Sequence, residues 1–480
     1  MREENPRSLR ITLVNNSREI YPPLGLCYLS AALKKKGVHS ISLVDRWRED
    51  NQGMVNRILR TEPHIIGMST YSVGFDNILD MCSMLRNRAP KIPVIWGGPH
   101  ITSLPESLPP EVDVGVIGEG EETFIELADG YASSGKFEGE WLASVKGISF
   151  RDGDKVRVNE RRLMKSNLDH LPLPDYLILD MDWYTAPKRF LVMKGIYRGT
   201  TIISSRGCPY RCIYCQASRQ WELIRYHSPE YVVENIRFLR STYPRINAIN
   251  IVDDLFTANR ARLEKIVEMV RSEGLHRGIS FNVNSRANLV DEESLKLLKA
   301  MNVVQIGYGF ESNSPGILSY LKKNTVTVED NERAAKLTNN YCIGVGGQFM
   351  LGTPGETRDD IMETIRFIRK FRMSHAHLSI TTPLPGTELW EDAKRKGFVA
   401  EQMNWRILDF GNPANPDLIY TNEAMSKDEF DEMKKKMQEA CKIHNAPISL
   451  YDLLQIALGK AYLLIRLLKN LVSAVIQSAK

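Results

Sequence analysis

Two stretches of this 480-residue chain alternate between short β-branched apolar runs and segments of helical periodicity. In the first stretch, from residue 10 to about residue 130, the apolar runs are ITLV, ISLV, HIIGMS, PVIWGG and DVGVIG. The helical segments between them stop at residues typical of helix ends, Gly37 and Pro90. Such an alternation builds a parallel sheet covered by helices. The sequence therefore predicts an amino-terminal α/β domain over residues 1–137, with a doubly wound, Rossmann-like sheet.

The alternation resumes after Tyr197 and continues through six strand-like runs. These runs are TTIISS, AINIVDD, GISFNVNSR, VVQIGYGFES, GVGGQFMLG and HAHLSITT. Six such steps predict a partial (β/α) barrel over residues 196–400. Between the two stretches, residues 138–195 contain a pair of hairpin-like runs and several prolines, which predict a linker with a small hairpin. Residues 401–480 are expected to form a helical carboxyl-terminal region.

The composition excludes several classes of protein. Apolar residues make up 43% and charged residues 25% of the chain, so a disordered, collagen-like or coiled-coil protein is not expected. The net charge is only +5, which gives no reason to expect a nucleic-acid partner. The first residues lack the apolar core and cleavage site of a signal peptide. We therefore expect a cytoplasmic protein whose seven cysteines do not form a disulfide framework.

Three of the cysteines lie close together in the segment RGCPYRCIYC. Cys208, Cys212 and Cys215 form a C-x3-C-x2-C arrangement directly after the predicted strand TTIISS. Three thiolates on one short loop are able to bind three irons of a [4Fe–4S] cluster and leave the fourth iron open. A structural zinc ion would require a fourth ligand, and His227 lies twelve residues after Cys215. The spacing therefore favours a cluster over zinc.

The same motif carries an aromatic residue, Tyr214, before its last cysteine, and this pattern resembles the radical S-adenosylmethionine (SAM) superfamily. The resemblance covers roughly residues 198–400. It implies that SAM chelates the open iron through its amino and carboxylate groups, and that one-electron reduction cleaves SAM to methionine and a 5′-deoxyadenosyl radical. It also implies an electron donor such as flavodoxin or ferredoxin.

Polar residues near the ends of the predicted barrel strands are the candidates for holding SAM. Glu311 resembles the acid that family members use near the bound cofactor. Asn284 and Arg286 share one face of the run FNVNSR, and Asp254 ends the run INIVDD. The segment FMLGTPGET, which contains Gly352, resembles the adenine-contacting strand of the family. The alternative for each residue is an ordinary strand-end cap or a surface position.

Two histidines alternate along the last predicted strand. His375 and His377 are two residues apart, so their side chains face the same side. A metal ion would need a third ligand, which is not evident in the sequence. Contact with substrate or cofactor and structural hydrogen bonding are the alternatives.

The first domain contains a second motif, formed by Ser69–Tyr71 and the pair Gly97-Gly98 with 25 residues between them. The motif resembles the cobalamin-binding domain, in which small residues at strand ends leave room for the flat dimethylbenzimidazole tail. The run VIGEGEETF is similar to the domains fused upstream of radical SAM barrels. The resemblance implies cobalamin contacts from Ser69, Tyr71, Gly97, Gly98, Gly118 and Glu119. For His100, contact with the corrin periphery and capping of a loop are the two alternatives.

The ligand on the lower face of cobalt is predicted from a position at which this sequence differs from other cobalamin-binding domains. Cobalamin domains that supply a histidine below cobalt carry an Asp-x-His-x-x-Gly loop after the first strand. When the glycine of that loop is aligned with Gly25, Pro22 stands in the histidine position, and proline cannot ligate cobalt. The cofactor is therefore expected to bind base-off, with no histidine as lower ligand. The alternative is that this domain keeps the fold and binds no cofactor. A nucleotide-binding site is disfavoured, because no glycine-rich phosphate-binding loop follows a strand in this domain.

Residues 448–477 show an amphipathic helical pattern. Their charged residues lie within about half of the helix circumference, opposite a face of Leu, Ile, Val and Ala. Such a face packs inside a protein, pairs subunits or lies on a membrane surface. Peripheral contact at the inner membrane face would suit a lipid-like substrate.

The two resemblances together imply a cobalamin-dependent radical SAM enzyme. The expected reaction methylates an unactivated carbon of a small-molecule or lipid substrate, through methylcobalamin and a 5′-deoxyadenosyl radical. The alternative within the class is an oxidative cyclase or another C–C or C–O bond-forming enzyme of tetrapyrrole or lipid metabolism. A non-catalytic carrier of iron–sulfur clusters or cobalamin is the alternative from another class.

Overall fold

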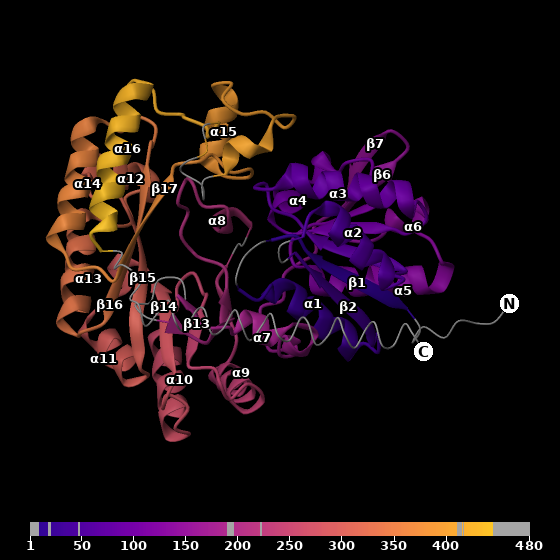
Figure 1. Cartoon of the computed structure of the whole chain (residues 1–480), viewed down its shortest axis with the longest axis horizontal. Coiled ribbons are helices and arrows are strands. Elements are labelled where there is room, and N and C mark those ends of the chain that lie inside the picture. Colours follow the sequence, from indigo (N-terminus) through magenta and orange to yellow (C-terminus); the bar gives the residue numbers. More distant parts are fainter. Residues whose placement is uncertain are drawn as a thin grey trace. The chain divides into compact units, whose positions relative to one another are not determined.

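The computed structural model describes residues 9–17, 21–46, 49–189, 196–220, 223–409, 415 and 417–444. The chain divides into two compact units, each assembled from three separate parts of the sequence. The first unit contains Met1–Leu179, Gly207–Tyr226 and Ile380–Asn422; the second contains Asp180–Arg206, His227–Ser379 and Glu423–Lys480. The sequence colours of Figure 1 allow these parts to be followed.

The first unit is built around a seven-stranded sheet with the order β2-β1-β3-β4-β5-β6-β7. Strands β1 to β5 are parallel, whereas β6 and β7 are antiparallel strands at one edge. The bounds are Arg10–Asn15 (β1), Ser40–Asp45 (β2), Ile65–Ser69 (β3), Val94–Gly97 (β4), Val114–Val116 (β5), Ile148–Asp152 (β6) and Lys155–Val158 (β7). The predicted doubly wound domain is confirmed. The hairpin β6–β7, expected in a linker, extends the same sheet.

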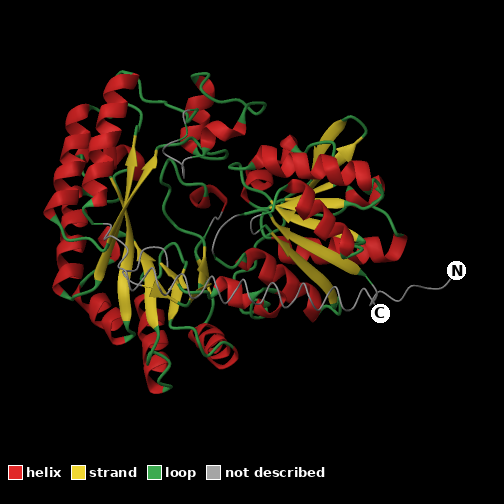
Figure 2. Ribbon diagram, viewed as in Figure 1, coloured by secondary structure: helices red, strands yellow, loops and turns green. Residues whose placement is uncertain are grey.

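Helices cover both faces of this sheet, as Figure 2 shows. Their bounds are Leu24–Lys35 (α1), Asn51–Arg60 (α2), Phe75–Arg88 (α3), Pro99–Ser103 (α4), Gly120–Ser134 (α5) and Gly139–Leu142 (α6). Successive strand residues point to opposite faces, so Val14 packs in a core with α2 and α3 while Leu13 packs in a second core with α1 and α5. Both faces of the parallel strands are therefore buried, which explains their nearly continuous apolar runs.

Residues 380–422 pack on the first unit and form no separate domain. Helix α15 (Glu388–Arg395) supplies Trp390, and a short turn after it supplies Trp405, to the core that also contains Trp96. The rings of Trp390 and Trp405 are stacked, with centroids 6.1 Å apart. Burial of such large rings is a strong drive for packing. The chain therefore returns to the first unit near residue 380, before the expected barrel boundary at residue 400.

The second unit contains a six-stranded sheet with the order β10-β13-β14-β15-β16-β17. Its pairs from β10 to β16 are parallel. The bounds are Gly199–Ile202 (β10), Ala248–Ile251 (β13), Ser280–Ser285 (β14), Val303–Glu311 (β15), Gly344–Leu351 (β16) and His375–Ile380 (β17), and a short pair is formed by Lys188–Arg189 (β8) and Ile196–Tyr197 (β9). The curved sheet in Figure 2 is the predicted partial barrel.

Helices alternate with these strands along the chain. Their bounds are Met181–Tyr184 (α7), Pro229–Thr242 (α9), Arg260–Ser272 (α10), Glu292–Ala300 (α11), Pro315–Lys322 (α12), Val328–Asn340 (α13), Arg358–Lys370 (α14) and Lys427–Lys442 (α16). Capping boxes fix the starts of α11, α13, α14 and α16. Helix α16 is held to α14 by Arg358, whose guanidinium bonds both carboxylate oxygens of Glu432.

No helix in the described part of the chain combines the length and the apolar character needed to cross a membrane. The amphipathic segment predicted at residues 448–477 lies outside the described residues.

Candidate cofactor-binding site

The cysteine loop, residues 207–226, belongs to the first unit. Cys212 is buried, while Cys208 and Cys215 are partly exposed. The backbone N of Cys215 donates a hydrogen bond to Cys212 O at 3.2 Å, which closes a tight turn around the half-buried Tyr214. The short elements of this region are Ser205–Arg206 (β11) before the loop, and Ala217–Gln220 (α8) and Arg225–Tyr226 (β12) within it.

The loop fits a [4Fe–4S] cluster. A cubane cluster takes one thiolate on each ligated iron, so three ligands spread around it and do not converge on one point. Three soft thiol donors on one loop therefore suit a cluster better than a mononuclear zinc site.

A carboxylate organises the chain after β13. Asp253 accepts hydrogen bonds from the backbone N and the hydroxyl of both Ser204 and Ser205, at 2.5–3.0 Å. Asp253 is therefore a structural residue. Desolvation of its carboxyl and the negative charge of Asp253 raise the pKa of the neighbouring Asp254 to about 6, although Asp254 as a whole residue is exposed, so solvent weakens both effects. A carboxyl with a pKa near neutrality at the carboxyl end of a barrel strand suits contact with a ligand.

Two predicted residues, Asn284 on β14 and Arg286 directly after it, are held by contacts within the second unit. Asn284 Nδ2 donates to Asp253 O at 3.3 Å. A Cβ atom at Gly307 would lie only 2.5 Å from Asn284 Oδ1, so the glycine makes room for the amide. Arg286 is buried and donates to the Thr325 hydroxyl. Asn284 thus lies on β14 beside β15, whereas Arg286 lies in the turn that follows β14.

Glu311 ends β15 in the left-handed region, with a φ of 61°. This conformation is costly for a residue with a side chain and often marks a functional position. The carboxylate forms an ion pair with Lys322 Nζ at 2.9 Å. Lys322 was not predicted from the sequence. The available signal was a lysine at the end of α12, on the helix face that also buries Leu318 and Leu321.

Gly352 lies in a turn closed by a buried acid. The backbone N atoms of Gly352 and Thr353 donate to Glu356 Oε2 at 2.7 and 3.2 Å. Burial raises the pKa of Glu356 to about 8. Because the N–H of Gly352 is committed to this turn, its carbonyl oxygen is the backbone group left for the predicted adenine contact.

His375 and His377 lie on one face of β17, as predicted, with their rings stacked and their centroids 6.2 Å apart. Burial lowers the pKa of His377, which favours a neutral imidazole. In the described residues the pair has no third metal ligand beside it.

The predicted cobalamin residues lie where β3, β4 and β5 end, and we call Ser69, Gly97, Gly98 and Gly118 the glycine edge. Ser69 is paired with Gly97 in the sheet register. Gly98 has a φ of 99°, and a Cβ atom there would lie 2.8 Å from Thr70 O, so only glycine permits this approach. A Cβ atom at Gly118 would meet nothing within 4 Å. Tyr71, beside Ser69 in sequence, is 51% exposed.

The glycine edge fits a flat heterocycle. Its glycines present no side chains to cover the strand ends, and the half-buried Ser69 hydroxyl can bond a ring nitrogen. The carboxyl ends of parallel strands are also where doubly wound sheets bind their ligands. The residues present thus suit the base-bearing tail of cobalamin.

His100 lies in the core of the first unit and is 0% exposed. Its Nδ1 bonds Ser72 Oγ at 2.9 Å and its Nε2 bonds Ser107 Oγ at 3.1 Å. The ring packs against Phe75 and Trp405, and burial lowers its pKa to about 3. With both nitrogens engaged by serines, the geometry favours the structural alternative over contact with the corrin.

Glu119 is engaged by a residue that the sequence did not single out. Its two carboxylate oxygens bond the two terminal nitrogens of Arg225, each at 2.9 Å. Arg225 also donates to Lys165 O at 2.9 Å. The predicted contact of Glu119 with cobalamin would therefore compete with the ion pair between Glu119 and Arg225.

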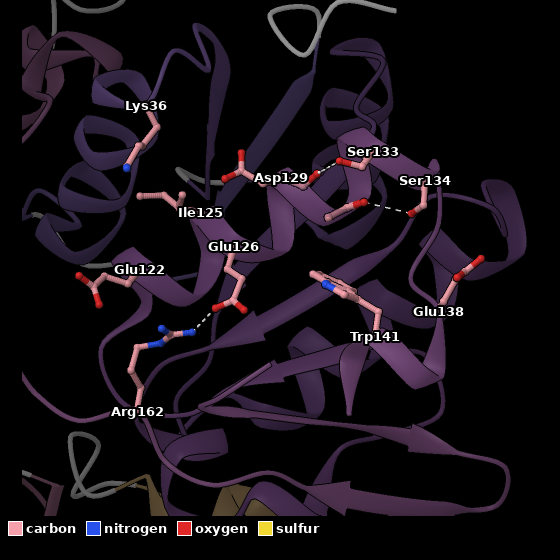
Figure 3. A pocket seen from close by; sticks show the side chains of 11 residues that line it. Lys36, Glu122, Ile125, Glu126, Asp129, Ser133, Ser134, Glu138, Trp141 and Arg162 are labelled. Atoms are coloured by element: carbon pink, nitrogen blue, oxygen red, sulfur yellow. Dashed lines mark hydrogen bonds and ion pairs between the residues drawn. The ribbon is translucent and has the colours of Figure 1, made fainter. Parts of the chain in front are cut away.

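A separate cavity of about 620 Å³ lies on the first unit (Figure 3). Its lining comes mainly from α5 and the region of α6, and Trp141 lies at one side. Of its acids, Glu126 pairs with Arg162 and Glu122 pairs with Lys165. None of the predicted site residues lines this cavity.

Comparisons with known proteins agree with this geometry. The B12 binding domain family matches residues 10–128, and the Radical SAM superfamily matches residues 202–368. The chain is 33% identical over 412 residues to an uncharacterized methyltransferase of Pyrococcus horikoshii, covering 85% of each protein. It is 26% identical over 381 residues to the anaerobic magnesium-protoporphyrin IX monomethyl ester cyclase of Cereibacter sphaeroides, covering 78% of this chain and 60% of the cyclase.

A solved structure shares the fold. The radical SAM methyltransferase TsrM of Kitasatospora setae, with cobalamin and a [4Fe–4S] cluster bound, has a TM-score of 0.64 and 20% sequence identity. The similarity covers 82% of this chain and 76% of TsrM.

The fold and the two sites define a class: proteins that join a cobalamin-binding sheet to a SAM-cleaving half-barrel. This chain belongs to the radical SAM superfamily, within the group that carries an amino-terminal B12 binding domain. The predicted family, fold class and cofactor set of [4Fe–4S] cluster, SAM and cobalamin are thereby confirmed.

Proposed function

We propose that this protein is a cobalamin-dependent radical SAM methyltransferase that methylates an unactivated carbon of a small-molecule or lipid substrate. One observation carries the proposal: the cysteine loop and the sheet with the glycine edge fold together in the first unit. The relative from Pyrococcus horikoshii, named as a methyltransferase, supports it with an alignment that covers 85% of each protein.

The chemistry is divided between the cofactors and the chain. When bound, the cluster supplies the electron that cleaves SAM, and cobalamin carries the methyl group. Cys208, Cys212 and Cys215 would hold the cluster and leave one iron for SAM. Glu311, kept in place by Lys322, would offer a carboxylate to the amino group of SAM. The half-buried amide of Asn284 would help to orient the ligand, and exclusion of water from such a site protects a reactive radical.

Anaerobic purification in the presence of hydroxocobalamin tests the proposal. We expect about four irons per chain, with sulfide and one corrinoid, since the cubane cluster and one B12 domain define this stoichiometry. With SAM and a reductant, both 5′-deoxyadenosine and S-adenosylhomocysteine should form. Cys212→Ala should lose the cluster and 5′-deoxyadenosine formation, whereas Cys342→Ala, outside the loop, should retain both. A protein that retains no corrinoid and forms no S-adenosylhomocysteine would refute methyl transfer.

A radical SAM cyclase is the second candidate, because the relative from Cereibacter sphaeroides is named as a cyclase. Cyclisation consumes SAM as a radical source and transfers no methyl group. It therefore predicts 5′-deoxyadenosine without S-adenosylhomocysteine in the same assay. A non-catalytic carrier predicts neither product.

The lower face of cobalamin is proposed to be base-off, with no histidine ligand, because Pro22 stands in the histidine position. The electron paramagnetic resonance spectrum of the reduced cofactor tests this, because a coordinated nitrogen splits the cobalt lines. Nitrogen splitting would contradict the proposal.

Two partners are proposed from chemistry and sequence. Flavodoxin or ferredoxin would deliver electrons singly, and each should support 5′-deoxyadenosine formation in place of dithionite. Residues 448–477 are proposed to contact a membrane surface peripherally, through the amphipathic pattern of their sequence. The full chain should then float with anionic vesicles and stay behind with zwitterionic ones.

A further inference from the structure

The amide of Gln216, the residue directly after Cys215, holds the cysteine loop to helix α4. Its Nε2 lies 3.0 Å from Ser103 Oγ, 3.1 Å from Pro385 O and 3.5 Å from Pro99 O. Two of these partners are backbone carbonyls, which accept hydrogen bonds only, so the donor end of the amide must face them. The orientation of Gln216 is therefore fixed by its surroundings.

Ser103, at the end of α4, is contacted by Gln216 and Gln220 of the cysteine loop and by Gly386. Gln220 Nε2, from the end of α8, also contacts Ser103 Oγ and Pro99 O, at 3.3 Å each. Gly386 approaches so closely that a Cβ atom there would lie 3.0 Å from Ser103 Oγ. The backbone N of Leu389 donates to Ile213 O at 3.0 Å, which adds a direct link from α15 to the loop. The cysteine loop is thus packed between α4 and the chain that leads into α15.

The second tie joins the far end of the same loop to the same sheet edge. Arg225, in the last strand of the loop, pairs with Glu119, which directly follows Gly118 of the glycine edge. Helix α4, which Gln216 contacts, begins directly after Gly98. The middle of the cysteine loop, at Gln216, and its carboxyl end, at Arg225, are therefore fastened to the two segments that leave the glycine edge.

We propose that Gln216 is a positioning residue that fixes the cluster relative to the cobalamin-binding edge, with the Arg225–Glu119 pair as the second tie. The inference rests on the proposed function, since it concerns how two cofactors of one reaction are held together. Misplacement of reacting groups by about 1 Å is enough to cost on the order of 100-fold in rate. A rigid loop of three cysteines without these ties would bind the cluster but leave its distance from cobalamin unset.

Gln216→Met tests the inference, because methionine keeps the length of the side chain and removes the amide donor. Gln52→Met is the matched control: Gln52 is exposed on α2 and contacts only its own helix in the bonds described. Each protein is purified anaerobically as the holoenzyme. Iron and corrinoid content, 5′-deoxyadenosine formation and S-adenosylhomocysteine formation are measured. The magnetic interaction between the reduced cluster and paramagnetic cobalamin is recorded by electron paramagnetic resonance.

The expected result separates positioning from folding. Gln216→Met should retain iron, corrinoid and 5′-deoxyadenosine formation within about twofold of wild type, since the cysteines and the strand ends are intact. S-adenosylhomocysteine formation should fall about 10- to 100-fold, and the cluster–cobalamin magnetic interaction should change. Gln52→Met should match wild type in every measurement. Gln216→Asn, which retains the donor on a shorter side chain, should recover part of the loss.

Three outcomes would overturn the inference. If Gln216→Met matches wild type in S-adenosylhomocysteine formation and in the magnetic interaction, the amide positions nothing. If the variant loses iron together with both activities, and Gln216→Asn does the same, the amide serves cluster retention only. If the wild-type protein forms no S-adenosylhomocysteine, the proposed function itself is refuted. The wild-type protein is therefore assayed before the variants are compared with it.

Discussion

Lys322 Nζ lies 2.9 Å from Glu311 Oε1, with the two side chains only 6% and 9% exposed. The pair joins the end of α12 to the end of β15, and Glu311 is held there with a φ of 61°. A carboxylate in so dry a place needs its countercharge, because desolvation is otherwise uncompensated. Lys322 is therefore part of the structure that holds the Glu311 side chain in place.

Replacing Lys322 by methionine should destabilise the protein markedly. The substitution keeps the buried aliphatic stem and leaves the Glu311 carboxylate without its partner, which typically costs about 3–5 kcal/mol. Urea unfolding of the anaerobic protein measures the loss. Lys323→Met is the control, since Lys323 is exposed and next in sequence, and it should change the free energy of unfolding by less than about 0.5 kcal/mol. Equal effects of the two substitutions would contradict the buried-pair argument.

Glu356 predicts a stability that falls with rising pH. Its pKa is about 8 in the folded chain, above the ordinary value of 4.5, so the folded state binds the proton more tightly than the unfolded state. The stability it contributes is complete below about pH 4.5 and is lost as the pH rises to about 8, by roughly 4 kcal/mol.

Glu356→Gln tests this dependence. The amide stays neutral and its oxygen can still accept from the N atoms of Gly352 and Thr353, so the variant should be more stable than wild type at pH 8.5. The difference should vanish near pH 5, as followed by unfolding midpoints across this range. Glu363→Gln, on the partly exposed side of α14, should leave the pH profile unchanged. A parallel pH profile for Glu356→Gln and wild type would show that Glu356 does not titrate in this window.

The sequence predicted the two sheets because periodicity and burial are local properties. β-branched runs, separated by helical segments, predict the strands β1 to β5 and the six strands of the second sheet without knowledge of their partners. The cysteine spacing was equally local, since three ligands of one cluster lie within residues 208–215. These features did not depend on contacts between distant residues.

The missed features are long-range pairs. Arg225 reaches Glu119 across 106 residues, and Gln216 reaches Ser103 across 113. Nothing in a single sequence pairs a given arginine with one of 58 acidic residues. His100 shows the same limit, because a histidine after a glycine pair reads as a ligand contact until Ser72 and Ser107 are found at its two nitrogens.

His100 predicts a loss of stability in acid. Burial lowers its pKa to about 3, below the ordinary value of 6.5, so the folded state holds the neutral ring while the unfolded state takes up a proton. The contribution of His100 is complete above about pH 6.5 and is lost as the pH falls toward 3. His100→Gln, which keeps hydrogen-bonding capacity without titrating, should flatten this acid limb relative to wild type. His39→Gln, at an exposed position, should leave the acid limb as it is, and unfolding midpoints between pH 4 and 7 measure both.

The Arg225–Glu119 pair predicts a strong coupling energy. Its side chains are 6% and 18% exposed, and the two bonds are both 2.9 Å long. In a double-mutant cycle with Arg225→Met and Glu119→Gln, we expect a coupling of about 2 kcal/mol, because each single change leaves a largely buried charge unpaired.

Arg225→Met should be the more damaging single change, because Arg225 Nη1 also donates to Lys165 O. The control is the Arg237–Glu273 pair, which also has two hydrogen bonds, from Nε and Nη2 at 3.0 and 2.9 Å, but side chains that are 51% and 33% exposed. Its cycle should give less than about 1 kcal/mol, because solvent screens the charges. Urea unfolding of the seven proteins, the wild type and the three variants of each cycle, measures both couplings. If the buried and exposed pairs coupled equally, burial would not be what makes the Arg225–Glu119 tie strong, and the loop end near residue 225 would be held by packing alone.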